Sequence, residues 1–407
     1  MAYIFKAAVV GAGTMGGSIA QTITFSGLPV VLKDIDEKAV EIGLDKVRDI
    51  YQKRVSKGKM TEGEMQMKMN LVTGTTTYED FEDVDIVIEA VPEDMAIKKK
   101  VLAELDEVLG EEAIIASNTS ALSITEMAAA TKRSGKVVGM HFFNPAHVMK
   151  LVEVIPGLTT DEETVESVIE FSESLRKIPV RVNECAGFLV NRLLSPYLNE
   201  AVMCVQEGAA TPEQIDEAMV EFGWPMGPFV LADMLGLDVC AKVSKIMYHA
   251  FGPRMSPPLL VDKLVAMGRL GQKNGKGFFD YQEDKGSEGL AEVIAETQKE
   301  SGCATGTVFS PERLNYALIN EAVVCLQENV SSAGDIDIAM MAGTGFPQDL
   351  GGPLKYADSV GVNVILEKLE AFSRELGPRF WPAPMLKRMV AAGFTGIEAG
   401  QGFYHHG

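Results

Sequence analysis

The stretch IFKAAVVGAGTMG, residues 4–16, joins a β-rich run to a glycine loop, and it decides how the first half of the chain folds. A helical pattern follows the loop, and a second β-rich run, LPVVLKD, ends at Asp34. The loop glycines Gly11, Gly13 and Gly16 have GxGxxG spacing, and the acidic residue stands roughly twenty positions further on. Strand, loop, helix, strand and terminal acid in this order predict a dinucleotide-binding unit of the Rossmann type.

Each part of this pattern has a physical role in holding a dinucleotide. The glycines permit a tight turn, close approach of the backbone to a pyrophosphate, and close packing of the helix. The start of the helix, at Thr14 and Met15, offers backbone amide donors and the positive end of a helix dipole. The Asp34 carboxylate can accept hydrogen bonds from the adenosine ribose and would repel a 2′-phosphate, so the sequence favours NAD over NADP.

Four further β-rich segments follow in the first half, with helical segments between most of them. They cover residues 70–75, 84–90, 113–118 and 136–142. Alternation of strands and helices is typical of a sheet with helices on both faces. We therefore predict an α/β, doubly wound Rossmann-type domain over residues 1–186.

A long charged segment separates Asp34 from the next β-rich run at Asn70, and its residue spacing is helical. Four cations gather in it, although the protein as a whole is acidic: Lys53, Arg54, Lys57 and Lys59. Two interpretations stay open for this cluster, a solvated helix face and an arm that binds phosphate.

Polar side chains follow the ends of several predicted strands. They are Glu89 and Glu93 after one strand, Ser117, Asn118, Thr119 and Ser120 after the next, and His141 at the end of a third. Because ligands of open α/β sheets bind at the carboxyl ends of the strands, we expect these side chains to line a site for cofactor and substrate. His141 stands beside an apolar run, VVGM, so a buried histidine with satisfied nitrogens is the alternative.

The second half of the chain is predicted to be mainly helical and contains a tandem repeat. RLLSPYLNEAVMCVQE at 192–207 resembles RLNYALINEAVVCLQE at 313–328, an offset of 121 residues. GPFVLADMLGLDV likewise resembles GPLKYADSVGVNV, here with an offset of 125 residues. We predict two all-α C-terminal domains, residues 187–300 and 301–407, that arose by duplication.

The two copies differ at polar positions. Asn191 of the first copy corresponds to Glu312 of the second, and Lys273 corresponds to Glu398. We therefore expect the second copy to support the fold without taking part in chemistry. A fused pair can also imitate a homodimer within one chain, so we expect a monomer or a loose homodimer.

Composition restricts the partners and the location. With 37 basic and 57 acidic residues the net charge is −20, which disfavours nucleic acid and anionic membrane surfaces as partners. The chain lacks an apolar run of the ~18 residues that a membrane helix needs, so we expect a cytoplasmic protein that does not enter membranes. The five cysteines have no metal-type spacing, so reduced thiols are expected and no metal site is predicted.

Seven motifs in order along the chain resemble the L-3-hydroxyacyl-CoA dehydrogenase family of fatty-acid β-oxidation: GAGTMG, EAVPED, SNTSAL, GMHFFNP, MKLVEV, GFLVNRLLSPY and PMGPF. The duplicated helical half resembles the dehydrogenase portion of multifunctional β-oxidation proteins. The resemblance implies NAD-dependent, reversible oxidation of an (S)-3-hydroxyacyl-CoA to the 3-ketoacyl-CoA. It also implies that enoyl-CoA hydratase or thiolase partners are possible.

The residues make chemical sense for that reaction. His141 fits the role of general base, because imidazole takes up a proton near neutral pH and the substrate hydroxyl must lose one. Glu153 follows on the next predicted strand and could hold the other ring nitrogen. In the family, the residues that match Ser120 and Asn191 bind the substrate oxygen. Because Asn191 belongs to the second domain, we expect the active site to lie in an interdomain cleft.

The resemblance also assigns contacts to NAD beyond the glycine loop and Asp34. These are Glu93, Lys98, Asn118, Asn144 and Lys273. For Lys98 and Lys273 a solvated lysine is the alternative. The sequence departs from the family at Ala186, where proline is common, and we expect only a local difference in the loop.

Two other functions stay open on the sequence. One is an NAD-dependent dehydrogenase of a non-CoA 3-hydroxy acid, and the other is a catalytically silent subunit that binds NAD or acyl-CoA. Acyl chain length, branching, pathway and physiological direction are not fixed by the sequence. His147 is a weaker candidate for the base, and we expect His405 and His406 to form a frayed tail.

Overall fold

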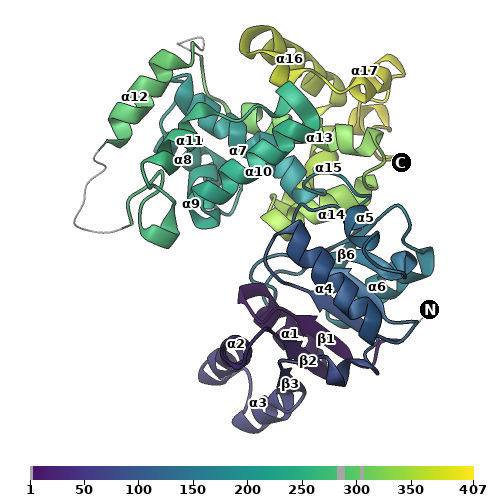
Figure 1. The fold of residues 1–407 in the computed structure, drawn as a ribbon. Coiled ribbons are helices and arrows are strands. Elements are labelled where there is room, and N and C mark those ends of the chain that lie inside the picture. The colour runs from purple at the N-terminus through teal and green to yellow at the C-terminus, as the bar shows by residue number, and fades with distance from the viewer. Residues whose placement is uncertain (1–2, 282–288, 303–306) are drawn as a thin grey trace. The chain divides into compact units, whose positions relative to one another are not determined.

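The structure is a computed structural model that describes residues 3–281, 289–302 and 307–407. It divides into two compact units, Met1–Phe188 and Leu189–Gly407, which are treated separately below (Figure 1).

The described part of the first unit is built on one eight-stranded sheet. Its strands are β1 (Ala7–Val10), β2 (Val30–Lys33), β3 (Val72–Thr75), β4 (Ile86–Glu89), β5 (Ile114–Ser117), β6 (Val137–Phe142), β7 (Leu151–Pro156) and β8 (Ile178–Arg181). The spatial order is β3-β2-β1-β4-β5-β6-β7-β8. Strands β1 to β6 pair in parallel, which gives the 3-2-1-4-5-6 order of a dinucleotide-binding sheet with its switch point between β1 and β4.

Six α-helices connect these strands. They are α1 (Thr14–Ser26), α2 (Glu37–Ser56), α3 (Glu62–Met69), α4 (Met95–Val108), α5 (Ile124–Ala128) and α6 (Glu162–Ser174). Every residue of β1 and β4 is buried because helices cover both faces of the sheet, and apart from Glu89 all of these residues are apolar. The charged insertion forms α2 and α3, and its ends carry caps: Asp36 accepts from the Ala39 amide, and Thr61 and Glu64 form a capping box. The predicted doubly wound α/β fold is confirmed.

The strand β7 reverses direction relative to the rest of the sheet. It pairs antiparallel with β6, and β8 then pairs parallel with β7. The antiparallel register places His141 directly opposite Glu153. Side chains opposite each other on neighbouring strands point to the same face of the sheet, so the register brings these two groups together.

The second unit is helical and its duplication is visible in the order of elements (Figure 1). The first copy contains α7 (Val190–Gln206), α8 (Pro212–Phe222), α9 (Pro228–Leu235), α10 (Leu237–Phe251) and α11 (Leu259–Ala266). The second copy contains α13 (Pro311–Gln327), α14 (Ala333–Thr344), α15 (Pro353–Val360), α16 (Val362–Leu376) and α17 (Pro384–Ala391). Helix α12 (Leu290–Glu300) lies between them in the sequence. Each helix of the first copy starts 121 or 125 residues before its counterpart, so the predicted tandem repeat is confirmed.

Buried ion pairs join the two copies in a reciprocal pattern. Arg192 on α7 donates to Glu321 on α13 at 2.7 Å, and Arg313 on α13 donates to Glu200 on α7 at 3.0 Å. Each arginine also reaches a second glutamate of the other copy, at 2.6 and 2.8 Å: Glu328 and Glu207. Because Arg192 and Arg313 are equivalent positions, the pairing follows the pseudo-symmetry of the repeat.

One expectation about the chain terminus is wrong. His406 does not belong to a frayed tail, because its Nε2 lies 2.8 Å from a carboxylate oxygen of Asp358 and its side chain is mostly buried. The same aspartate accepts the amide N–H groups of Phe403 and Tyr404. Tyr281, at the position of His406 in the first copy, donates to Asp233 in the same way. The C-terminal segment therefore completes a motif of the repeat.

No helix in the described ranges combines the length and the apolar character needed to cross a membrane. Cys204 and Cys240 are free thiols, whereas Cys303 lies outside the described residues.

Candidate active site

The glycine loop follows β1 and each of its glycines has a distinct steric reason. Gly11 has φ of +99°, and a side chain there would meet the Ala90 carbonyl oxygen at 2.5 Å. A side chain on Gly16 would overlap the Gly11 carbonyl, so only glycine lets α1 pack this closely. Gly13 has open space where its side chain would stand. The loop therefore leaves room for a ligand to approach the backbone at Gly13.

The first turn of α1 borders this open space. Gly13 is the N-cap and offers no side chain to accept hydrogen bonds from the first amide groups, and Thr14 beside it is exposed. A helix N-terminus of this kind attracts the negative charge of a phosphate. Met15 lies half-buried in the first turn. These residues fit the pyrophosphate of a dinucleotide.

Asp34 directly follows β2 and is tied to the glycine loop. Its Oδ2 accepts from the Ala12 amide at 2.6 Å, and its Oδ1 accepts from the Ile35 amide at 2.7 Å. Each carboxylate oxygen has a further lone pair for a ribose hydroxyl. The two backbone bonds fix the carboxylate at the end of β2, beside the loop that would hold the pyrophosphate.

His141 and Glu153 form a buried hydrogen-bonded pair at the end of β6. The His141 Nδ1 lies 2.7 Å from the Glu153 Oε2. The histidine is 6% exposed and the glutamate 0%. The rings of Phe143 and Phe188 pack beside the imidazole, with centroids 4.6 and 6.0 Å away. The pair is therefore held in a mainly apolar surrounding, with one imidazole nitrogen committed to the carboxylate.

A second buried pair lies at the end of β4. The Lys98 ammonium is 1% exposed and donates to both carboxylate oxygens of Glu89, at 2.8 and 3.1 Å. Glu89 also accepts from the Ser117 hydroxyl at the end of β5 and from the Val91 amide. The solvated alternative for Lys98 is wrong, because the ammonium compensates a buried carboxylate and crosslinks α4 to two strand ends.

The loops after β4 and β5 are joined by Glu93. Its Oε1 accepts from the Thr119 hydroxyl at 2.7 Å and from the Ser120 amide at 2.9 Å. Lys98 lies 3.4 Å from the other carboxylate oxygen. Asn118 bonds in the other direction, since its side-chain oxygen accepts the Phe142 amide at 2.8 Å next to His141. The structure thus brings Glu93, Lys98, Asn118 and Ser120 into one network.

Asn144, Asn191 and Lys273 are the remaining expected site residues. Asn144 is exposed in the segment that follows β6. Asn191 lies in the first turn of α7, in the second unit, as the sequence predicted. Lys273 is half-exposed and paired with Asp238 in the second unit. Their roles toward NAD or substrate remain predictions.

A cationic pocket of ≈ 450 Å³ opens on the first unit between α1, the end of α2 and two loops. Its charged lining residues carry positive charge or can gain it, and they are Lys53, Arg54, Lys57, Lys59, His147, Lys150, Arg176 and Lys177. The Arg54 guanidinium stacks on the Phe25 ring at 4.5 Å, and its Nε is buried without a partner among the described residues. This pocket is suited to an anion.

Sequence reasoning missed half of this pocket. The four cations at and just beyond the end of α2 are visible as a cluster in the sequence, but Lys150, Arg176 and Lys177 come from the segments after β6 and α6. Burial lowers the pKa of His147, and nearby lysines lower it further. His147 therefore belongs to the pocket, whereas His141 is the histidine that Glu153 contacts. Clusters of His, Cys, Asp and Glu suited to a metal ion are absent from the described ranges.

A dinucleotide-type sheet with a buried histidine–glutamate pair on β6 and β7, followed by a helical domain, defines an NAD-type oxidoreductase architecture. Comparison with known proteins agrees with this class. The family model for the 3-hydroxyacyl-CoA dehydrogenase NAD-binding domain matches residues 6–185. The model for the C-terminal domain of the same family matches twice, at 187–281 and 309–406. The chain belongs to the 3-hydroxyacyl-CoA dehydrogenase family.

Individual relatives support the assignment. A fatty acid oxidation complex subunit alpha from Shewanella amazonensis is 41% identical over 402 residues, which is 96% of this chain and 56% of that protein. The chain thus spans about half the length of the curated relatives it matches. A crystal structure of 3-hydroxybutyryl-CoA dehydrogenase from Escherichia coli K12 is 31% identical, with a TM-score of 0.87 over 96% of this chain and 99% of that one. An (S)-3-hydroxybutyryl-CoA dehydrogenase from Ralstonia eutropha is 43% identical, with a TM-score of 0.67 over 69% of this chain and all of its own length.

Proposed function

We propose that this protein catalyses the reversible, NAD-dependent oxidation of (S)-3-hydroxyacyl-CoA to 3-ketoacyl-CoA. The observation that carries the proposal is the contact of 2.7 Å between His141 Nδ1 and Glu153 Oε2, on strands β6 and β7 of a sheet whose first loop fits a dinucleotide. When bound, NAD supplies the acceptor for the hydride that leaves C3 of the substrate.

His141 acts as the general base in this proposal. Its Nδ1 faces Glu153, so Nε2 is the nitrogen that takes the hydroxyl proton as the carbonyl forms. Glu153 orients the ring and stabilises the imidazolium that results. In the reverse direction the same nitrogen returns the proton to the alkoxide, so one pair serves both directions.

Ser120 and Asn191 are proposed to hold the substrate oxygen. Their hydroxyl and amide groups can donate hydrogen bonds to a carbonyl oxygen that gains negative charge. The Ser120 backbone amide donates to Glu93, and this bond fixes the position from which the Ser120 side chain extends. Asn191 begins α7 and brings a polar group from the helical unit.

The NAD assignment rests on the glycine loop, the open first turn of α1 and Asp34. The carboxylate of Asp34 favours NAD, because the extra phosphate of NADP would bring like charge to it. Lys98 supports the site indirectly, because its ammonium contacts the carboxylates of Glu89 and Glu93 and so fixes the loop between them. Asn118, Asn144 and Lys273 complete the proposed set of NAD contacts.

Coenzyme A is the proposed carrier because of the cationic pocket. Coenzyme A bears a pyrophosphate and a 3′-phosphate, and the protein as a whole is strongly acidic. Phosphates therefore need local compensation, which the lysines and arginines around Arg54 offer. A dehydrogenase of free 3-hydroxy acids would not need a pocket that binds the phosphates of coenzyme A. A catalytically silent binding subunit would not need the His141–Glu153 pair.

The setting of the enzyme is part of the same proposal. Relatives named as subunits of a fatty acid oxidation complex support a role in fatty-acid β-oxidation in the cytoplasm, with hydratase or thiolase partners. The reciprocal pairing of the two helical copies supports a monomer or a loose homodimer.

A steady-state assay of NADH oxidation tests this function. Acetoacetyl-CoA and longer 3-ketoacyl-CoAs should be reduced, whereas the free 3-keto acids should react far more slowly. The same assay with NADPH in place of NADH controls for cofactor choice. Equal rates with and without the CoA moiety would contradict the CoA assignment, and no reduction of any member of the panel would contradict the dehydrogenase.

A further inference from the structure

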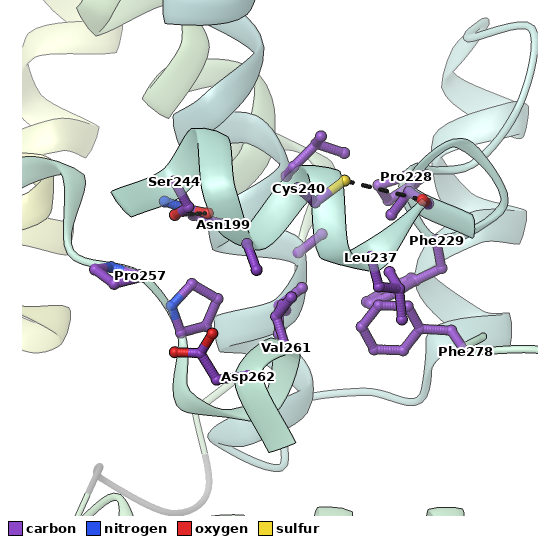
Figure 2. A pocket seen from close by; sticks show the side chains of 16 residues that line it. Asn199, Pro228, Phe229, Leu237, Cys240, Ser244, Pro257, Val261, Asp262 and Phe278 are labelled. Carbon is purple, nitrogen blue, oxygen red and sulfur yellow. Dashed lines mark hydrogen bonds between the residues drawn. The ribbon is translucent and has the colours of Figure 1, made fainter. Parts of the chain in front are cut away.

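The helical unit contains a second cavity, in its first copy (Figure 2). It lies between α7, α9, α10 and the start of α11. Its lining is mainly apolar, with the rings of Phe229 and Phe278 at one end and Asn199 and Ser244 toward the other. The cavity volume is ≈ 30 Å³, and one water molecule needs only about 10–15 Å³ on this measure. The space thus suits a few carbon atoms.

Four lining positions carry larger side chains in the second copy, whereas Phe229 and Leu237 correspond there to the smaller Leu354 and Val362. Cys240, Ala241 and Ser244 on α10 correspond to larger aliphatic residues on α16, and Val261 on α11 corresponds to one on α17. Those residues are Ile365, Leu366, Leu369 and Leu386, and all of them are buried. On the α10 and α11 side, the cavity is thus lined by smaller residues than the matching positions of the second copy, and it lies in the copy that also carries Asn191.

The two copies also differ in the hydrogen bonds between the equivalent asparagines, Asn199 and Asn320, and the backbone. In the second copy the Asn320 side chain accepts the Ala383 amide at 2.8 Å and donates to the Trp381 carbonyl at 3.0 Å. In the first copy Pro258 replaces the alanine and has no N–H to donate. Asn199 instead accepts from Ser244 at 3.2 Å, and its Nδ2 is buried without a partner among the described residues. In the second copy, two hydrogen bonds from Asn320 hold the backbone at Trp381 and Ala383. Pro258 cannot form the matching amide bond in the first copy.

The cavity is aligned with Asn191 along one helix. Leu198 and Val202 line the cavity, and they stand seven and eleven residues after Asn191, so all three lie on one face of α7. At a rise of ~1.5 Å per residue the distance from Asn191 to Leu198 is about 10 Å along the axis. An extended chain advances roughly 1.2 Å per bond, so about eight bonds span this distance.

We propose that this cavity receives the end of the substrate's acyl chain and that the protein consequently prefers acyl groups of about ten to fourteen carbons over four. This inference rests on the proposed function, since it takes Asn191 as the partner of the C3 oxygen. The lining favours an alkyl end over a charged one. Asp262 is its charged member, and it would repel a terminal carboxylate.

The test uses the second copy as the template for closing the cavity. Ser244→Leu places the residue of position 369 at its counterpart, and Val261→Leu is a milder change that copies Leu386. The measured quantity is the ratio of kcat/KM for 3-ketododecanoyl-CoA to that for acetoacetyl-CoA. We expect each variant to lower the ratio, Ser244→Leu by about tenfold or more, because the cavity no longer admits the chain end. Lys242→Leu, an exposed neighbour on α10 outside the lining, is the matched control and should keep the wild-type ratio.

Direct binding separates this inference from the proposed function. Calorimetry should show that dodecanoyl-CoA binds the wild type more tightly than acetyl-CoA does, and that Ser244→Leu and Val261→Leu reduce this difference. If the wild type reduces no 3-ketoacyl-CoA, the proposed function is overturned. If the two variants still reduce its binding preference for dodecanoyl-CoA in that case, the cavity assignment stands. Folded variants that retain both the kcat/KM ratio and the binding difference would overturn the cavity assignment. Equal use of a 3-ketoacyl-CoA with a terminal carboxylate would also overturn it.

Discussion

His141 and Glu153 meet because β6 and β7 pair in antiparallel register, which places the two side chains opposite each other. The motifs identify both residues, but their contact depends on the antiparallel register of β6 and β7, which a spacing of twelve residues does not specify. Lys98 illustrates the opposite case. A single lysine in a helical segment is usually solvated. Only the fold reveals that Glu89 lies close enough to compensate the charge of a buried Lys98. Residue types were predictable here, but their burial was not.

Asp34 yields a prediction about cofactor choice. We expect the wild type to use NADH with a kcat/KM at least roughly a hundredfold above that for NADPH, because the carboxylate would stand near the 2′-phosphate. Asp34→Asn removes the charge but keeps an acceptor for the Ala12 amide. This variant should lower the ratio of kcat/KM for NADH to kcat/KM for NADPH by about tenfold or more. Steady-state kinetics with both cofactors measure the ratio, and KM for acetoacetyl-CoA is the control. An unchanged ratio would exclude Asp34 from cofactor recognition.

The cationic pocket belongs to the scale of elements, because no single segment builds it. The end of α2 supplies the cluster that is visible in the sequence, and the segments after β6 and α6 supply the rest. Lys177 joins two of these segments, since its ammonium donates to the carbonyls of Ala146 and Met149. The open choice between a solvated helix face and a phosphate-binding arm could be narrowed only once these segments were seen around one cavity.

The pocket should lose affinity for CoA in alkaline solution. Burial lowers the pKa of Lys177 to about 8, so its charge is present below that pH and is lost above it. Between pH 7 and 9 we expect KM for acetoacetyl-CoA to rise about two- to fivefold, as one partly exposed charge is lost. KM for NADH, measured across the same range, is the control. Lys177→Arg stays charged and should flatten the rise; a rise equal to that of the wild type would show that Lys177 is not its cause.

The whole molecule is best understood through its duplication. Similar sequences reveal the repeat, but the reciprocal pairs between α7 and α13 emerge only when the helices pack. The glutamates of each copy neutralise arginines of the other, and Arg379 of the second copy also donates to Glu200 at 2.7 Å. The two copies thus share one network of buried charges, and the expectation that the second copy supports the fold stays a prediction.

Breaking one of these pairs should destabilise the helical unit strongly. Glu200→Gln leaves Arg313 and Arg379 with less compensation in a buried setting, which costs about 3–5 kcal/mol. For a unit of this size that loss lowers the melting temperature by roughly 6–20 °C. Lys387→Ala, which breaks a half-exposed pair with Glu370, should change stability by less than about 1 kcal/mol. Equal melting temperatures for Glu200→Gln and the wild type would contradict a stabilising role for the cluster.

Replacement of His141 by glutamine is the most direct test of the proposed chemistry. The measurement is kcat for NADH-dependent reduction of acetoacetyl-CoA, together with Kd for NADH. We predict that kcat falls by a factor on the order of a hundred or more, because the proton donor and acceptor is lost, while Kd stays within about twofold. A kcat close to that of the wild type would contradict the assignment of His141 as the residue that moves the proton.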